Sequence, residues 1–339
     1  MEIPSISRVI ALVVWSICLL PALTGIGESS LIDEAKKEGT VVVYSTMNAE
    51  HYGKLVQAFH AKYPFIKVEG FRGNSVRVVN RVLTEGRAGR PLVDVINVDE
   101  LSGWVLREKG FLQPYKSKET DAFPEHFRDP EGFFPCCAYV ITNSLAYNKK
   151  LVSKEEAPRT FQDLLLPKWK GKLGMESDSS KLFAALVPIW GKEQTVNYFQ
   201  ALMKQQPSMR SGRTLLAQLM AAGEFSVGLG FYAYLILEQQ EKGLPLEIVQ
   251  ADPVVAWTWR LLLSRVARHP NSASLFIDYA LSEEGQRYLA SLGRTVIRPG
   301  IKNKYPQLVE DVKLYPVRPD SGKDYETLSK TYYNIVNAR

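Results

Sequence analysis

The stretch VVVYSTMNAEHYGKL, at residues 41–55, changes its hydrophobic period partway along. Its first four residues form a continuous apolar run, which is typical of a buried strand. Small polar residues follow at 45–48, and apolar side chains then recur at helical spacing, at Tyr52, Leu55, Val56 and Phe59. The stretch therefore predicts a buried strand that ends in polar residues where a helix begins.

The same plan recurs twice in the next 55 residues. A short strand is predicted at 66–71, followed by polar residues and a helix that ends near Gly86. The apolar run VDVINV at 93–98 predicts a third strand, with Asp99 as the N-cap of a helix that stops at Gly110. Three strand-cap-helix units in series predict a parallel sheet with right-handed crossovers, which is an α/β fold.

Parallel strands end at one edge of their sheet, so the polar residues after each strand should gather there. Each also lies near a helix N-terminus, where unpaired N–H groups favour an anion. Taken singly, such residues are explained by helix capping alone. Taken as a set, they predict a ligand-binding rim made of Ser45, Thr46, Asn48, Asn74, Ser75 and Asp99.

The second half of the chain repeats the strand-cap-helix pattern. Strands are predicted at 172–175 and 225–230, and the polar segments ESDSS (176–180) and MRSGRT (209–214) each precede a helical face. The expected second rim contains Asp178, Ser179, Ser180, Arg213, Thr214 and Tyr232. Arg72 is a further candidate for a charge-assisted contact, whereas Trp257 is expected in the core.

An apolar strand at 256–264 and two capped helices then return the chain to the first half. The predicted organisation is lobe 1 from residues 28–138 and 256–300, lobe 2 from residues 139–255, and a C-terminal tail, 301–339, packed on a lobe without an assigned function. A chain that leaves one lobe and comes back crosses a hinge twice, and two hinged lobes with facing rims enclose a ligand.

The N-terminal 27 residues have the order of a cleavable signal peptide. Arg8 precedes an apolar run at 9–23, and small residues follow. No later segment is long and apolar enough to cross a bilayer. We therefore expect an exported, periplasmic protein that does not span the membrane in its mature form and is a monomer.

Composition narrows the classes of partner. The 339 residues carry a formal net charge of +6, which favours acidic partners, but the Lys and Arg residues are scattered, which argues against nucleic acid. Outside the leader only Cys136 and Cys137 remain. Adjacent cysteines make no useful disulfide and no zinc site, so they are expected to be buried strand residues.

The chain resembles the periplasmic solute-binding proteins of ABC transporters, in the branch called ferric-ion or family 1 extracellular solute-binding proteins. The resemblance rests on the order and spacing of VVVYST, RAGRPLVDVINV, PRTFQDLLLPKWKGKLGM, LLAQLMAAGEFSVGL and HPNSASLFIDYALSEEGQRYLASLGR, and it covers nearly the whole mature chain. It implies a two-lobed type II binding-protein fold, capture of a solute in the cleft, delivery to a membrane permease, and no catalysis and no cofactor.

The resemblance leaves two solutes open. Iron-binding members hold Fe(III) with an early His, an acidic residue and two adjacent tyrosines, whereas this chain has Asn48 near the His position and Phe231-Tyr232 near the tyrosine pair. Tyr232 and Tyr234, with Tyr139 or Asp99, are the oxygen ligands left for iron. The favoured solute is instead a small organic or phosphorus-containing anion bound by helix N-termini and an arginine.

An enzyme is the alternative from another class. The segment GLGFYA at 228–233 fits the G-x-G-x-x-A dinucleotide fingerprint, and Asp252 lies at a suitable distance for a ribose contact. The fingerprint comes late in the chain, in the second lobe of an exported protein, so a tight strand-helix turn explains it better. The sequence contains no G-x-S-x-G, H-E-x-x-H or P-loop motif. We therefore expect a binding protein rather than an NAD-dependent enzyme.

Overall fold

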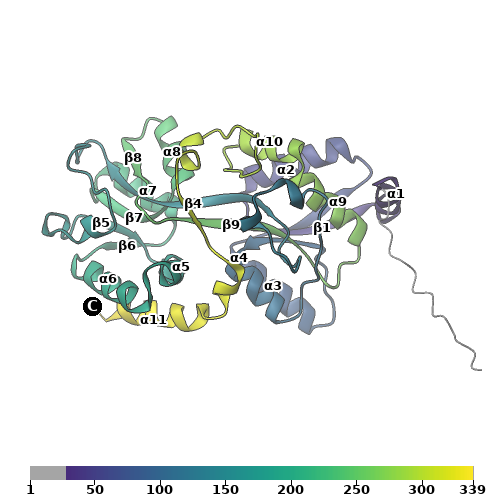
Figure 1. Ribbon diagram of the computed structural model, residues 1–339, viewed down its shortest axis with the longest axis horizontal. Coiled ribbons are helices and arrows are strands. Elements are labelled where there is room, and N and C mark those ends of the chain that lie inside the picture. Colours follow the sequence, from purple (N-terminus) through teal and green to yellow (C-terminus); the bar gives the residue numbers. More distant parts are fainter. Residues whose placement is uncertain (1–27, 339) are drawn as a thin grey trace, which may run out of the picture.

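The computed structural model describes residues 28–338, so the predicted signal peptide lies outside the described residues. The fold is α/β, with one continuous path of hydrogen-bonded strands in the order β2-β1-β3-β9-β4-β7-β5-β6, while β10 pairs with β9 and β8 with β4 (Figure 1). The strands are β1 (Thr40–Ser45), β2 (Lys67–Arg72), β3 (Val95–Asp99), β4 (Cys137–Asn148), β5 (Leu173–Glu176), β6 (Ser208–Arg210), β7 (Val227–Tyr232), β8 (Leu246–Val249), β9 (Val254–Leu263) and β10 (Leu314–Pro316).

Helices flank these strands on both sides (Figure 1). The α-helices are α1 (Glu28–Glu38), α2 (Ala49–Lys62), α3 (Ser75–Arg87), α4 (Glu100–Glu108), α5 (Ser180–Trp190), α6 (Lys192–Lys204), α7 (Arg213–Ala222), α8 (Ala233–Glu241), α9 (Pro270–Leu281), α10 (Glu283–Ser291) and α11 (Tyr325–Asn337). The short 3-10 helices are η1 (Thr120–Ala122), η2 (Glu125–Phe127), η3 (Gln162–Leu165), η4 (Pro167–Trp169), η5 (Pro306–Leu308) and η6 (Pro319–Gly322). None of these helices combines the length and apolar character needed to cross a membrane.

The three predicted strand-cap-helix units are present. β1 pairs in parallel with β2 and with β3, and the polar residue after each strand caps the following helix. Asn48 accepts from the N–H of His51, and Asn74 accepts from the N–H of Arg77. Asp99 accepts from the N–H of Ser102 at the start of α4. The predicted caps are therefore confirmed.

Two long antiparallel strands join the lobes, which confirms the two-lobed class. β9 pairs with β3 of lobe 1 on one side and with the first half of β4 on the other. The second half of β4 pairs with β7 and β8 of lobe 2. Both predicted lobe boundaries, 138/139 and 255/256, fall inside these shared strands, so the boundaries stay a prediction.

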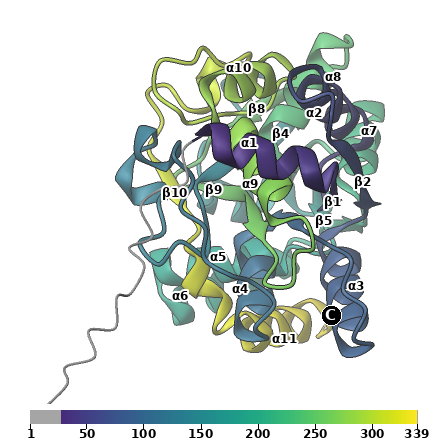
Figure 2. The same ribbon diagram turned by 90° about the vertical axis from the view of Figure 1, so that its right-hand side faces the viewer.

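The N-terminal helix α1 and the continuity of β4 differ from the sequence-based picture. α1 was not expected; it packs across α9 on the outer face of lobe 1 (Figure 2), and Glu38 accepts from the N–H groups of Asn271 and Ser272. The segment YVITNSLAYNKKLV at 139–152 is typical, by sequence, of two extended pieces, but β4 is one strand. It stays extended because sheet partners are available along its whole length.

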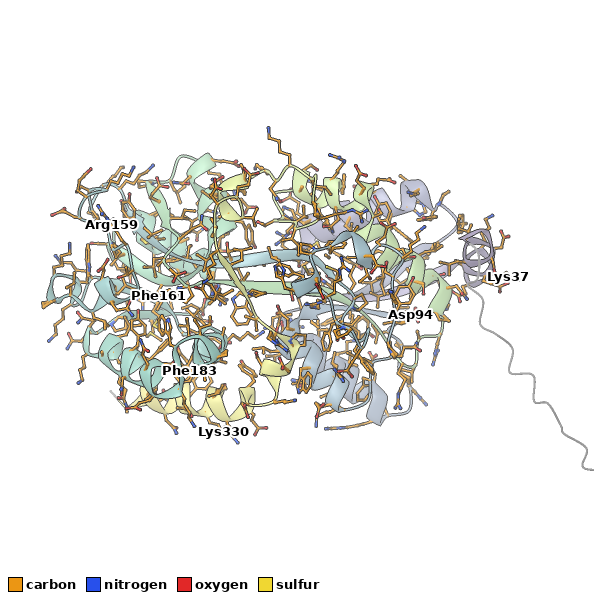
Figure 3. The ribbon with its side chains drawn as sticks, viewed as in Figure 1. Lys37, Asp94, Arg159, Phe161, Phe183 and Lys330 are labelled. Carbon is orange, nitrogen blue, oxygen red and sulfur yellow. The ribbon has the colours of Figure 1, made fainter. Side chains whose placement is uncertain are left out.

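Side chains fill both lobes (Figure 3). In lobe 2, the rings of Phe183, Phe199 and Tyr332 pack edge to face, and in lobe 1 the fully buried Asp94 accepts from the N–H of Val42 and of Arg268. Cys136 and Cys137 are buried free thiols, as predicted, but only Cys137 lies in a strand, at the start of β4.

The C-terminal segment contacts both lobes, although the sequence predicted packing on one. It runs between the lobes and then turns into α11 beneath lobe 2 (Figure 1). β10 pairs with β9, Gly322 lies against Trp104 of α4 in lobe 1, and Tyr332 packs into the aromatic core of lobe 2. The segment is therefore an additional connection between the lobes.

Candidate functional site

A pocket of about 330 Å³ lies between the lobes, where the fold class predicted the cleft. Lobe 1 supplies one wall from α3 and α4, lobe 2 supplies the other from the starts of α5, α7 and α8, and α11 adds one residue. The lining residues are Asn74, Ser75, Val76, Val79, Asn80, Leu101, Ser102, Val105, Asp178, Lys181, Arg213, Tyr232 and Tyr325.

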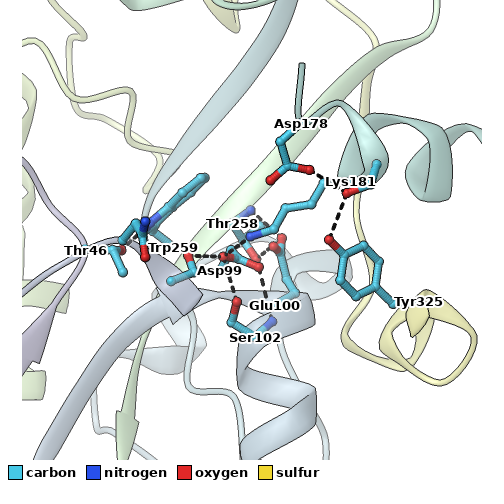
Figure 4. A network of polar contacts seen from close by, with 12 residues as sticks. Thr46, Asp99, Glu100, Ser102, Asp178, Lys181, Thr258, Trp259 and Tyr325 are labelled. Carbon is cyan, nitrogen blue, oxygen red and sulfur yellow. Dashed lines mark hydrogen bonds and ion pairs between the residues drawn. The ribbon is translucent and has the colours of Figure 1, made fainter. Parts of the chain in front are cut away.

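An ion pair crosses the cleft beneath this pocket. The Nζ of Lys181, in the first turn of α5, lies 2.7 Å from Oδ2 of Asp99 in lobe 1 (Figure 4). The Asp99 side chain is fully buried, and it also accepts from the hydroxyls of Ser75 (2.6 Å) and Ser102 (3.0 Å). Every polar atom of this carboxylate is thus satisfied, and one of its partners belongs to the other lobe.

The charges of this pair stabilise each other against burial. Burial opposes ionisation of Asp99, yet the Lys181 ammonium and the bonds from Ser75 and Ser102 hold the pKa of Asp99 below its usual range. Burial also opposes the charged form of Lys181, but the Asp99 carboxylate raises the pKa of Lys181 above its usual value. Both groups are therefore ionised at neutral pH.

Arg213 is held so that part of its guanidinium faces the pocket. Its Nε–H donates to the carbonyl of Gly230 (3.0 Å), and its guanidinium lies 4.1 Å from the ring centroid of Tyr232. No ion-pair partner of Arg213 occurs within residues 28–338. The terminal Nη groups are therefore donors available to a ligand.

The backbone at Gly230 makes this arrangement possible. Ser144 of β4 pairs with Phe231, and Leu145 pairs with Leu229, so Gly230 is the extra residue of a β-bulge. Its φ of +88° suits glycine, and a Cβ there would lie 3.1 Å from Oγ of Ser179. The glycine pattern at 228–233 thus has a structural explanation, since Gly228 lies inside β7, against Phe231 and Gly174.

The loop before α5 is tightly organised. Ser179 is buried and its Oγ–H donates to the carbonyl of Glu176, whereas Ser180 donates to Oδ1 of Asp178 (2.7 Å). Tyr325 of α11 lies 3.0 Å from the same Ser180 hydroxyl (Figure 4). Burial raises the pKa of Tyr325, so its hydroxyl is neutral and able to donate.

The first part of the predicted rim lies outside this pocket. Ser45 is buried and donates to Oδ1 of Asn97, Asn48 caps α2, and Thr46 accepts from the indole N–H of Trp259 (2.8 Å). Arg72 donates to the carbonyl of Met47. These side chains are engaged within the protein, and a ligand-binding role for them stays a prediction.

The other candidates divide into two groups. Asn74, Ser75, Asp178, Arg213 and Tyr232 line the pocket, with Asp99 directly below them. The Ser179 and Ser180 side chains support the loop, while Thr214 is exposed and away from the lining. Trp257 is buried, as expected.

Sequence reasoning missed Lys181 and Tyr325. Lys181 places a positive charge in the first turn of a helix, at the positive end of the helix dipole. This unfavourable placement could have identified Lys181 as a candidate functional residue. Tyr325 carried no comparable signal, because its role arises only when α11 reaches the cleft.

The tyrosines proposed for iron lie together, but each faces a cation. Tyr232 and Tyr234 stack with centroids 6.3 Å apart. Arg213 lies over Tyr232, while Arg294 lies 4.9 Å from the ring of Tyr139 and 5.0 Å from that of Tyr234. Burial raises the pKa values of Tyr139 and Tyr234, which keeps both phenols protonated.

The residues at or near the other positions of the iron-binding pattern are engaged within the protein or unsuited as ligands. Phe231 is fully buried, and Asn48 is occupied as a cap. His51 is 7% exposed, and burial together with the charge of Arg294 lowers its pKa to about 4. Within the described part of the chain, no three His, Cys, Asp or Glu side chains are grouped as metal ligands.

A larger cavity of about 690 Å³ lies between α4, the 126–131 loop, α5 and the C-terminal segment. Two of its cations are paired with carboxylates: Arg107 with Glu131 (2.5 Å) and Arg318 with Asp320 (3.2 Å). Arg260 donates to backbone carbonyls, including those of Phe127 and Phe134.

Comparison with known proteins identifies the family of this chain. A family model described as bacterial extracellular solute-binding protein matches residues 91–313. Iron uptake protein A1 of Synechocystis sp. is 27% identical over 287 residues, covering 78% of this chain and 77% of its own.

Solved structures share the fold at low identity. Iron-bound HitA from Pseudomonas aeruginosa superposes with a TM-score of 0.76 at 20% identity, covering 87% of this chain and 99% of its own. AfuA from Actinobacillus pleuropneumoniae, solved with fructose-6-phosphate bound, gives 0.73 at 24% identity, covering 89% and 97%. Both likenesses concern the two-lobed fold.

Proposed function

The chain belongs to the bacterial extracellular solute-binding proteins, and from this premise we propose that it captures a small organic or phosphorus-containing anion in its interlobe cleft. It then acts as the periplasmic, non-enzymatic component of an ABC importer, exported by a cleavable signal peptide, and delivers the solute to a permease. Closure of the lobes around the solute forms the surface that the permease recognises.

The position of Arg213 is the main reason for proposing an anionic solute. Its side chain is fixed by Gly230 and Tyr232, so little rotamer freedom remains to be lost when a ligand binds. Arg213 lines a pocket in which the other cation, Lys181, is already neutralised by Asp99. A carboxylate or phosphate matches the paired donors of a guanidinium.

Helix N-termini on both sides of the pocket support the same choice. α3 begins at Ser75 in lobe 1, whereas α5 and α7 begin at Ser180 and Arg213 in lobe 2. The amides of a first helical turn have no acceptor inside the helix, and the dipole places partial positive charge there. An anion between these ends would be held by backbone donors from opposite lobes.

Fe(III) is the second candidate, favoured by the stacked pair Tyr232 and Tyr234 and by the name of the Synechocystis relative. The fold does not distinguish between the two solutes, because the similar solved structures include one with iron bound and one with fructose-6-phosphate bound. The arginines over both tyrosine rings oppose a trivalent cation, since like charges would be brought together.

Binding to the purified mature protein tests the proposal. Inorganic phosphate, fructose 6-phosphate, citrate and ferric citrate are compared by thermal shift and calorimetry. An anion present at a hundred times its dissociation constant stabilises the folded state by about 2.7 kcal/mol. We expect Arg213→Gln to weaken the binding of that anion about 10- to 100-fold, because hydrogen bonds to a charged group are lost.

The controls separate the two solutes. Arg159→Gln removes an exposed arginine at the outer end of lobe 2 (Figure 3) and should leave binding unchanged. Arg213→Lys keeps the charge but loses the paired donors, so it should also bind weakly. A tyrosinate-to-iron absorption band that disappears in Tyr232→Phe, with no response to any iron-free anion, would replace the proposal by the iron alternative.

A further inference from the structure

Three tyrosines of α11 hold the loop that leads into α5. Tyr332 donates to the carbonyl of Ser177 (3.0 Å) and accepts from the N–H of Ser179 (3.3 Å). Tyr333 donates to Oδ1 of Asp178 (3.1 Å), and Tyr325 meets the hydroxyl of Ser180. Each residue of the 177–180 loop thus has a partner on a helix that lies about 150 residues further along the chain.

The loop and α11 each contribute a residue to the solute pocket. Asp178 and Tyr325 both line it, as does Lys181 in the first turn of α5 (Figure 4). Oδ1 of Asp178 already accepts from Ser180 and Tyr333, whereas Oδ2 has no donor among residues 28–338. Asp178 therefore brings a carboxylate oxygen without a donor to a pocket whose other charged group available to a ligand is the cation Arg213.

Packing alone does not require these hydroxyls. The ring of Tyr332 packs against Phe183 and Phe199 and already anchors α11 on lobe 2. Tyr333 is 40% exposed, so its hydrogen bond to Asp178 adds little burial. The bond instead fixes which oxygen of Asp178 remains free.

We propose that α11 forms part of the solute-binding site. Tyr325 contacts the solute, and Tyr333 orients the carboxylate of Asp178. Through its free Oδ2, Asp178 accepts from a hydroxyl or amino group of the solute, while Arg213 holds the anionic group. The site thus selects an anion that also carries a hydrogen-bond donor over a bare anion. This inference rests on the proposed function.

Attachment to lobe 1 gives α11 its position at the cleft. Gly322, just before the helix, packs so closely on Trp104 that a Cβ would lie 2.5 Å from the Cβ of Trp104. The ammonium of Lys323 lies 5.3 Å from the same indole ring. The segment therefore reaches the pocket from a fixed point on the opposite lobe.

The binding test compares fructose 6-phosphate with sulfate, a tetrahedral dianion that carries no proton at neutral pH, by calorimetry. We expect Tyr333→Phe and Tyr325→Phe each to weaken the binding of fructose 6-phosphate about three- to tenfold, as for one net hydrogen bond, and to change the binding of sulfate by less than about twofold. Tyr288→Phe, on α10 in lobe 1, is the control. A loss shared equally by both probes, or no loss of either, would overturn the proposal, since a merely structural role does not change their ratio.

A second measurement needs no solute. Hydrogen exchange at the amides of residues 177–181 should be faster in Tyr332→Phe and Tyr333→Phe than in the wild type, and unchanged in Tyr288→Phe. Thermal unfolding checks that each variant is folded. If neither probe binds the wild type, the proposed function fails, and the exchange data alone decide whether α11 positions the loop; unchanged exchange in both variants would then refute that role.

Discussion

The carboxylate of Asp99 and the ammonium of Lys181 join the two lobes through an ion pair of 2.7 Å. Asp99 is fully buried and Lys181 is one-quarter exposed, so the pair is sheltered from solvent but not sealed from it. Because the partners lie on different lobes, their attraction favours a closed cleft.

Breaking this pair should weaken both stability and closure. Asp99→Asn leaves the Lys181 ammonium without its counter-charge, and we expect a loss of about 2–3 kcal/mol, at the lower end for buried pairs because Lys181 is partly exposed. Chemical denaturation measures the loss, and small-angle scattering should show a larger radius of gyration. Glu283→Gln, which breaks the exposed pair with Arg287, should cost much less, because exposed ion pairs contribute little to stability. Equal costs for the two variants would contradict the interpretation.

Glu100 should make the protein less stable as pH rises. Its Oε1 accepts from the N–H and hydroxyl of Thr258, and its Oε2 has no partner among the described residues. Burial raises its pKa to about 8, although Arg260 acts in the opposite direction. The folded protein therefore keeps a proton that the unfolded chain releases above its ordinary pKa of 4.5.

This stabilising contribution is complete below pH 4.5 and is lost as pH rises towards 8. Glu100→Gln stays neutral throughout, so its free energy of unfolding should fall less than that of the wild type between about pH 5 and about pH 8. Urea unfolding at the two pH values measures both slopes. Parallel slopes would show that Glu100 is ionised in the folded protein.

His51 should make the protein less stable as pH falls. Its folded-state pKa is about 4, below the ordinary 6.5, so its contribution is present above pH 6.5 and is lost as pH falls towards 4. We expect His51→Gln to be less sensitive to acid than the wild type over that range. The exposed His126→Gln serves as the matched control, and a wild-type-like acid profile for His51→Gln would contradict this prediction.

Gly322 should tolerate no side chain. In Gly322→Ala the new Cβ would meet Trp104, so we expect a destabilisation of about 1–3 kcal/mol from overpacking and a change in tryptophan fluorescence. Gly53, inside α2, has nothing within 4 Å of an added Cβ, so Gly53→Ala should instead stabilise by about 0.5–1 kcal/mol. Two substitutions that behave alike would exclude the close contact as the cause.

The strand-cap-helix units were predictable because their determinants are local. Asn48, Asn74 and Asp99 cap helices that begin at the next residue, so each signal lies within a few positions of its effect. β4 was harder, because its length depends on partners in two lobes that a local pattern does not reveal.

The solute site was only partly predictable. Arg213 and Asp178 could be named because they sit at helix starts, but the partner of Asp99 is 82 residues away in sequence, and Tyr325 is 145 residues from Ser180. Hydrophobic period and capping chemistry act over one helical turn, so the sequence by itself determined the two α/β halves and their polar edges. Which polar side chains meet across the cleft depends on how the lobes and the C-terminal helix pack, and only the tertiary structure decided that.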